Sequence, residues 1–352
     1  MKLIHTSDLH IGSPLTARLP HDKTVRRRRE LISTFRAMIE EGEKIGAEGM
    51  IIAGDLFDSE KVGRRTAEEV AEAMASAPEM TFFYLPGNHE RSAFADAGVA
   101  LPQNLRFFDT GWTYFDFHGV RIVGRQQTAA DMFADIPMPG AGRCIAVLHG
   151  ELRDRSAAGG VIGERDLPGD LDLLCLGHYH SYSEKAVGPR TRAVYCGTPE
   201  GRGFDEAGEC GFVLIEIDDR AVTTRFIPFA RRRMRLLSVD ISGAESLSDV
   251  YAALEAALAG VPGEDLVRAV LCGRVAPELD FDADALTDRF ADRFFYFEVR
   301  DETRLILDPE RYRYDPSLKG ELIRLVSADQ TLSEEDRKAV ILCGLRALAG
   351  EE

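Results

Sequence analysis

The sequence lacks several features that would place a protein outside a reducing cytoplasm. Its six cysteines form no CxxC pair and several lie within apolar runs, which favours buried, reduced thiols over a zinc site or a disulfide framework. No apolar run approaches the roughly 20 residues that cross a bilayer, and residues 1–10 contain neither an apolar core of signal-peptide length nor a cleavage motif. We therefore predict a cytoplasmic protein.

Basic residues are also in deficit. The chain has 43 lysines and arginines against 59 aspartates and glutamates, a net charge of −16. The average field of such a chain repels phosphates, so any surface that binds nucleic acid must be a local basic patch. We expect residues 26–29, near the start of a long helix, to form a solvated face, with contact to a DNA backbone as the alternative. Residues 231–235 fit a hinge and a phosphate-facing patch equally well.

Length and pattern divide the chain into parts, and its 352 residues favour two or three domains. Residues 1–232 alternate short strands with helices, the rhythm of a layered α/β domain. The predicted elements there are strands at 2–6, 50–53, 80–85, 144–148 and 171–176, helices at 24–45 and 64–75, and hairpins at 112–124 and 211–229. Beyond them we predict strands at 236–241, 266–275 and 294–299, helices at 247–259 and 283–293, and tail helices at 317–327 and 333–349.

Five short blocks at predicted strand ends carry residue types that bind metals. The blocks are Asp8-Leu9-His10, Gly54-Asp55-Leu56-Phe57-Asp58, Gly87-Asn88-His89-Glu90, His149-Gly150 and Gly177-His178-Tyr179-His180. A mixed set of oxygen and nitrogen donors suits Mn²⁺, Fe²⁺ or Zn²⁺ better than the all-oxygen shell of Ca²⁺ or Mg²⁺. In extended chain, residues i and i+2 point the same way, so Asp8 with His10, and His178 with His180, can each converge on one point.

The number of candidate ligands is informative in itself. They are Asp8, His10, Asp55, Asn88, His149, His178 and His180. Seven ligands are too many for one ion but suit two ions that share a carboxylate, the arrangement that clamps both sides of an in-line phosphoryl displacement. The predicted chemistry is hydrolysis by a metal-activated water that attacks phosphorus, which requires no covalent nucleophile.

In their order, D-x-H, G-D, G-N-H-E, H and G-H-x-H, the blocks resemble the calcineurin-like metallophosphoesterases over residues 8–180. Within that family the segments TSDLHIGSPL, AGDLFD, LPGNHE and YCGTPEGR are most similar to the SbcD-type DNA-repair nuclease subunits. The resemblance implies an α/β fold, a layered metallophosphoesterase β-sandwich flanked by helices, with a small α+β cap domain and a C-terminal helical tail. Because the pattern changes at residues 231–235 and Asp-Pro pairs punctuate a linker further on, we assign residues 1–232 to the nuclease domain, 233–302 to the cap, and 303–352 to a linker and partner-docking tail.

The resemblance also implies a role for each block. Asp8, His10 and His180 would hold one ion, Asn88, His149 and His178 would hold a second, and Asp55 would bridge the two. His89 would be catalytic, facing the scissile phosphate, and Arg202 would shape the rim of the site and bind substrate. Asp58 is our own candidate for a partner of His89, because a carboxylate beside an imidazole favours the protonated form that a general acid needs.

The resulting hypothesis is a DNA exonuclease or endonuclease with two divalent ions, Mn²⁺ foremost and Mg²⁺, Fe²⁺ or Zn²⁺ as alternatives. The resemblance implies a homodimer and a coiled-coil ATPase partner of the SbcC type, onto which the tail would dock; packing of the tail on its own cap is the alternative. The rival enzyme is a phosphodiesterase of small nucleotides or other small phosphodiesters that needs no partner, which the acidic composition favours. A non-catalytic scaffold is disfavoured because no metal position is lost.

Overall fold

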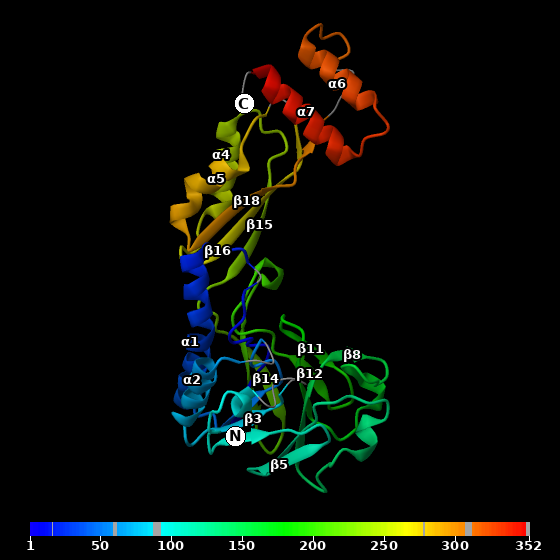
Figure 1. Ribbon diagram of the computed structural model, residues 1–352. Helices are drawn as coiled ribbons and strands as arrows, with labels where there is room; N and C mark the ends of the chain where they lie inside the picture. The colour runs from blue at the N-terminus through cyan, green and yellow to red at the C-terminus, as the bar shows by residue number, and fades with distance from the viewer. Residues whose placement is uncertain (16, 59–61, 87–92, 277–278, 307–311, 350–352) are drawn as a thin grey trace. The chain divides into compact units, whose positions relative to one another are not determined.

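The computed structural model describes residues 1–15, 17–58, 62–86, 93–276, 279–306 and 312–349. The chain falls into two compact units, Met1–Arg233 and Met234–Glu352 (Figure 1). The further division of the second unit into a cap and a tail stays a prediction. Among the helices that the structure describes, none has the length and apolarity needed to span a membrane.

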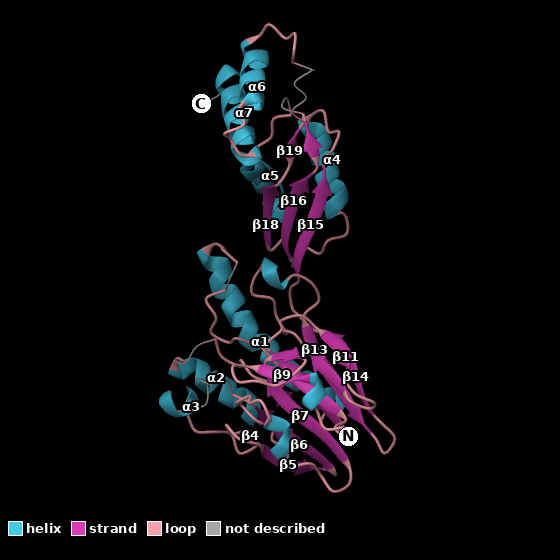
Figure 2. Ribbon diagram, turned by 90° about the vertical axis from the view of Figure 1, so that its right-hand side faces the viewer, coloured by secondary structure: helices cyan, strands magenta, loops and turns pink. Residues whose placement is uncertain are grey.

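Two six-stranded mixed sheets form the centre of the first unit (Figure 2). The first runs in the order β14 (Val222–Pro228), β13 (Gly211–Ile217), β1 (Lys2–Thr6), β2 (Gly49–Ile52), β3 (Thr81–Tyr84) and β4 (Leu105–Phe107). The second runs β11 (Ser183–Ala186), β12 (Arg192–Tyr195), β10 (Leu173–Gly177), β7 (Arg143–His149), β6 (Val120–Gly124) and β5 (Thr113–Phe117). The inner strands β1, β2 and β3 are parallel to one another, as are β6, β7 and β10, so their carboxyl ends meet at common sheet edges.

Alternating side chains on the strands build two cores. Leu3 and Ile51 point between the sheets, where they pack in one cluster with Val147 and Cys175 of the second sheet. Their neighbours on the strands point the opposite way, to a cluster built with α1 (His21–Ile45) and α2 (Arg64–Ala75), which lie side by side on the outer face (Figures 1 and 2). The predicted α/β fold with flanking helices is therefore confirmed, and the structure shows that both sheets are mixed.

The second unit contains a parallel sheet in the order β15 (Met234–Asp240), β16 (Leu266–Cys272) and β18 (Tyr296–Asp301), with α4 (Leu247–Leu258) and α5 (Ala283–Phe290) packed in the same core. A capping box of Ser246 and Asp249 starts α4. The predicted strand 266–275 is wrong in one respect. Gly273, whose φ of +101° lies outside the extended region, separates β16 from the short strand β17 (Arg274–Val275). Glycine suits this position because a Cβ there would also lie 2.3 Å from the Asp240 carboxylate.

The tail forms a helical hairpin of α6 (Leu318–Ala328) and α7 (Glu334–Ala349) around its own small core, which includes Ile323 and Ile341. The Ser333 hydroxyl accepts from the Asp336 N–H at 3.0 Å, as the predicted helix start requires. The prediction of buried thiols is wrong for Cys343, which is exposed because only one face of α7 packs inward.

Candidate metal centre

The ends of β1 and β2 bring the first acidic residues together. Asp8 follows β1 and Asp55 follows β2, and the two turns are tied by backbone hydrogen bonds from the Asp8 N–H to Gly54 O (3.1 Å) and from the His10 N–H to Asp55 O (3.0 Å). Gly54 has φ +92°, and a Cβ at this position would lie 2.2 Å from His149 Nδ1. Only glycine therefore allows the imidazole of β7 to approach this turn.

Backbone strain gathers at the same place. Asp8, His10, Asp55 and His178 all have positive φ, at 52°, 44°, 51° and 104°. Within the described ranges only Leu15 and His118 share this property among residues other than glycine. Such conformations cost on the order of 1–3 kcal/mol each and persist where the surroundings enforce them, typically at functional sites.

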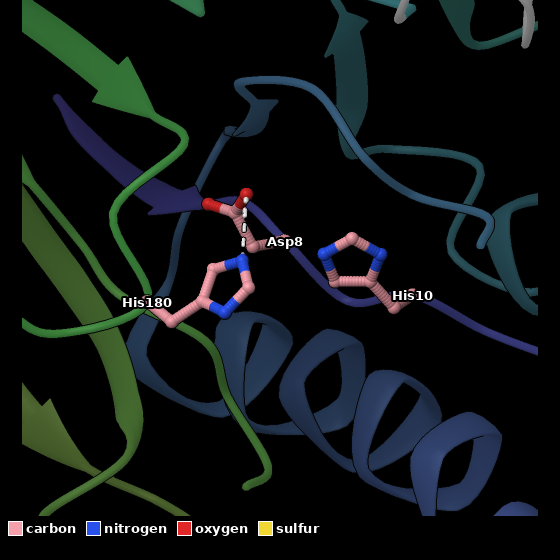
Figure 3. A group of neighbouring side chains, drawn as sticks. All are labelled: Asp8, His10 and His180. Atoms are coloured by element: carbon pink, nitrogen blue, oxygen red, sulfur yellow. Dashed lines mark ion pairs between the residues drawn. The ribbon is translucent and has the colours of Figure 1, made fainter. Parts of the chain in front are cut away.

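Two overlapping groups of side chains have the proximity that metal binding requires. One consists of Asp8, His10 and His180, and the other of Asp8, Asp55 and His149; within each group the ligand atoms lie within 4.8 Å of one another. Figure 3 shows the carboxylate of Asp8 facing the ring of His180, and the His10 ring further along the same segment as Asp8. Asp8 Oδ1 lies 3.7 Å from His180 Nε2.

Asp8 belongs to both groups, and Asp55 of the second group also lies close to a histidine of the first. The Asp55 Oδ2 atom lies 3.7 Å from His10 Nε2 and 3.6 Å from His149 Nε2. The ring of His178 is packed edge-on against that of His149 at 5.5 Å between centroids. The backbone N–H of His178 donates to the Asp8 carboxylate at 3.0 and 3.2 Å. Asn88 and His89 lie outside the described residues. The structure thus brings together five of the seven predicted ligands and places His178 beside them.

These residues fit a divalent cation. Both ring nitrogens of His10 are buried and lack a hydrogen-bond partner, although Asp58 Oδ1 lies 3.2 Å from Nδ1. Burial, reinforced by Arg202, lowers the pKa of His10 to about 4, which keeps the imidazole neutral and able to ligate. Burial also raises the pKa of Asp8, because a carboxylate charge is destabilised when it is removed from water. A bound cation would offset this destabilisation.

A second layer of residues holds the imidazoles. Glu206 Oε1 lies 2.7 Å from His180 Nδ1, and Ala53 O lies 2.9 Å from His149 Nδ1. Although burial raises the pKa of Glu206, its hydrogen bonds with His180 and Arg202 outweigh that effect and lower it to about 2. Carboxylates that orient ligating histidines in this way commonly tune metal affinity. The sequence analysis did not identify Glu206 as a site residue. Its only mark in the sequence is its position four residues after Arg202, which does not reveal the contact with His180.

Arg202 and Asp58 belong to this layer. Arg202 is 7% exposed, and its guanidinium donates to Glu206 Oε1 at 2.7 Å and to Asp58 Oδ1 at 3.1 Å. Asp58 in turn contacts His10, as described above. Both side chains therefore support the histidines of the first group. Substrate binding by Arg202 and a dyad of Asp58 with His89 stay predictions.

A buried ion network lies behind the loop that carries Arg202 and Glu206. Arg27 of α1 is fully buried and donates to Glu30 Oε2 (2.7 Å) and to Glu200 Oε2 (2.9 Å), and Arg232 donates to Glu30 at 3.0 Å. The predicted solvated face is therefore wrong for Arg27, because its charge is neutralised by two buried carboxylates. The network ties the 200–206 loop to α1 and so fixes the base of the site.

Carboxylates and imidazoles clustered at the strand ends of a two-sheet α/β unit define this protein as a metal-dependent phosphoesterase. The pattern of the calcineurin-like phosphoesterase family matches residues 1–182, and the chain belongs to that family. The predicted family resemblance is thus confirmed.

Among curated proteins, the chain is 24% identical over 305 residues to the DNA double-strand break repair protein Mre11 of Methanosarcina acetivorans, covering 80% of this chain and 47% of that protein. It is 21% identical over 278 residues to the uncharacterized metallophosphoesterase YhaO of Bacillus subtilis, covering 72% of this chain and 67% of that protein. A dimetal phosphatase from Danio rerio, a solved structure, aligns at 8% identity over 65% of this chain and 98% of its own, with a TM-score of 0.38. The chain spans about half the length of the Mre11 relative, to which it is distantly related.

Proposed function

We propose that this protein is the nuclease subunit of a cytoplasmic DNA-repair complex of the SbcCD type, hydrolysing phosphodiester bonds in DNA. The observation that carries the proposal is Asp55, whose carboxylate lies between the His10 and His149 imidazoles of two overlapping ligand groups. This geometry supports a carboxylate shared by two ions, the arrangement suited to phosphodiester hydrolysis.

In this proposal the seven ligands hold two divalent ions, Mn²⁺ foremost. When bound, such ions lower the pKa of a water and neutralise charge on the phosphate oxygens. The protein positions the diester, and His89 donates the proton that the departing ester oxygen takes up as the phosphorus–oxygen bond breaks. Asp58 and Glu206 keep the His10 and His180 rings oriented.

Two observations support DNA as the substrate. Relatives of this chain are named as double-strand break repair proteins. In addition, the start of α1 carries the exposed Arg28 and Arg29, and Arg28 donates to Ser13 O at 3.2 Å in the turn that follows His10. A local basic surface therefore lies beside the candidate metal centre. A chain with a net negative charge needs such a surface to bind a polyanion.

The substrate is tested by incubating the Mn²⁺-loaded protein with linear duplex DNA, single-stranded DNA, cyclic nucleotides and an aryl phosphodiester. We expect cleavage of DNA that is lost in Asp55→Ala and His89→Ala variants. Turnover of small nucleotides alone, with no cleavage of DNA even after an SbcC-type ATPase is added, would establish the rival small-phosphodiester enzyme instead. Gel electrophoresis of the DNA products also distinguishes exonuclease from endonuclease cleavage.

We also propose that the tail docks onto the coiled-coil ATPase, and that this subunit forms a homodimer. While Ile323 and Ile341 fill the core of the tail hairpin, Leu318 and Leu325 on α6 are 74% and 63% exposed. An apolar helical surface of this kind suits burial against a partner helix.

The tail interaction is tested on the full chain. The double variant Leu318→Gln/Leu325→Gln should reduce retention of the ATPase in a pull-down at least tenfold, since it removes two apolar anchors worth about 1–2 kcal/mol each. Leu236→Gln, at a 54% exposed leucine of β15, is the matched control. Equal retention by both variants and the wild type would mean that the tail does not dock in this way.

A further inference from the structure

Tyr179 is an exposed aromatic side chain next to the candidate metal centre. It stands between His178 and His180 and is 43% exposed. In the described part of the first unit, the exposed large apolar side chains are Leu101, Tyr114 and Tyr179, and of these only Tyr179 adjoins a candidate ligand. Hydrophobic burial therefore does not account for an aromatic residue at this position.

The ring of Tyr179 is supported from one side. It packs on Tyr195 at 4.7 Å between centroids, and Tyr195 is 5% exposed. Two hydrogen bonds hold the Tyr195 hydroxyl in place: it donates to Gly150 O and accepts from the Leu152 N–H, each at 2.9 Å. A buried and doubly hydrogen-bonded ring is a rigid backing, so Tyr179 presents a preformed surface that costs little entropy when a ligand covers it.

A row of rings leads from this surface to the metal centre. Tyr179 lies 5.5 Å from the His178 ring, the His178 ring lies 5.5 Å from that of His149, and His149 Nε2 lies 3.6 Å from Asp55. A group attached to a phosphate bound at Asp55 and His149 would extend along this row of rings toward Tyr179. In a nucleic acid that group is a nucleoside, whose base has an aromatic face that stacks on tyrosine.

We propose that Tyr179 is a specificity-determining residue that stacks on the nucleobase adjoining the scissile phosphate, so that the site selects nucleoside phosphodiesters over diesters without a base. The inference rests on the proposed phosphodiester hydrolysis and adds the group recognised beside the phosphate. Because every base has an aromatic face, this recognition tolerates any sequence. It applies whether the nucleotide belongs to DNA or to a small molecule.

The test compares two substrates with the same leaving group, the p-nitrophenyl ester of thymidine monophosphate and methyl p-nitrophenyl phosphate. The ratio of their kcat/KM values isolates the contribution of the nucleoside. We expect Tyr179→Leu to lower this ratio about tenfold, or about 1.4 kcal/mol of stacking. Tyr179→Phe should keep the ratio because it keeps the ring. Tyr114→Leu, at a 48% exposed tyrosine of β5, is the matched control.

A binding measurement accompanies the kinetics. The fluorescence of 2-aminopurine nucleoside monophosphate should be quenched on binding to the wild type and to Tyr179→Phe, with about tenfold weaker binding to Tyr179→Leu. An unchanged substrate ratio in Tyr179→Leu, or equal quenching by Leu and Phe variants, would overturn the stacking role. Failure of the wild type to hydrolyse either diester would instead contradict the proposed function, so the two failures are distinguishable.

Discussion

The Asp55→Asn variant is expected to hydrolyse phosphodiesters about 10³-fold more slowly in kcat/KM, a loss of about 4 kcal/mol of transition-state stabilisation. The amide keeps the shape of the side chain but removes its charge and one of its two carboxylate oxygens, at a residue whose Oδ2 atom faces both His10 and His149. Asp8 is common to both described ligand groups, whereas Asp55 lies within 3.7 Å of one histidine from each group through its Oδ2 atom. Steady-state kinetics on an aryl phosphodiester at saturating Mn²⁺ gives the measurement.

The melting temperature of the same variant gives a second, independent test. The charge of Asp55 contributes to the raised pKa of Asp8, although burial is the larger cause, so the two carboxylates repel each other without a cation. The variant should therefore melt at the same temperature as the wild type or higher in EDTA, yet lose most of the stabilisation that Mn²⁺ gives the wild type. Asp116→Asn, at an exposed aspartate of β5, is the control. Wild-type activity in Asp55→Asn would contradict a shared-carboxylate role.

Glu206→Gln is expected to weaken metal binding by about 10- to 100-fold. The glutamine can still accept from His180 Nδ1, but it lacks the charge that pairs with Arg202 and makes the His180 ring a stronger ligand. Isothermal titration with Mn²⁺ measures the affinity directly. Because Glu206 acts through His180 and not on the substrate, high Mn²⁺ should restore most of kcat.

The matched control for this variant is Glu209→Gln, three residues along the same loop, where the carboxylate pairs with Arg233 at 2.9 Å and not with any of the candidate ligands that the structure describes. It should bind Mn²⁺ as the wild type does. If Glu206→Gln and Glu209→Gln bound Mn²⁺ equally well, then Glu206 would serve only to hold the loop. A loss of kcat that high Mn²⁺ does not reverse would likewise exclude the positioning role.

The sequence predicted most of the fold because apolar alternation and helical periodicity are local signals. The strand 2–6 and the helix 64–75 lie where they were expected, and β13 coincides with the first half of a predicted hairpin. The break at Gly273 was missed because the apolar pattern continues through it, and only the backbone reveals the positive φ. The burial of Arg27 was missed for a different reason, since its partner Glu200 is 173 residues away in the chain.

The candidate site shows the same limit. The five blocks indicated which residues to expect at the strand ends, and the parallel strands bring Asp8, Asp55 and His149 within reach of one another. Glu206 and the contact of Asp58 with His10 depend on how a loop folds back over the strands, which no local pattern encodes. The roles of Asn88 and His89 stay predictions because these residues lie outside the described ranges.

The most direct test of the shared-carboxylate centre is the number of Mn²⁺ ions that the purified chain binds, measured by equilibrium dialysis against Mn²⁺ with the protein concentration determined by amino-acid analysis. We predict two tightly bound ions per chain in the wild type and fewer than two in Asp55→Asn. Saturation of the wild type at a single ion, or the same stoichiometry in both proteins, would contradict a centre in which Asp55 joins two metal sites.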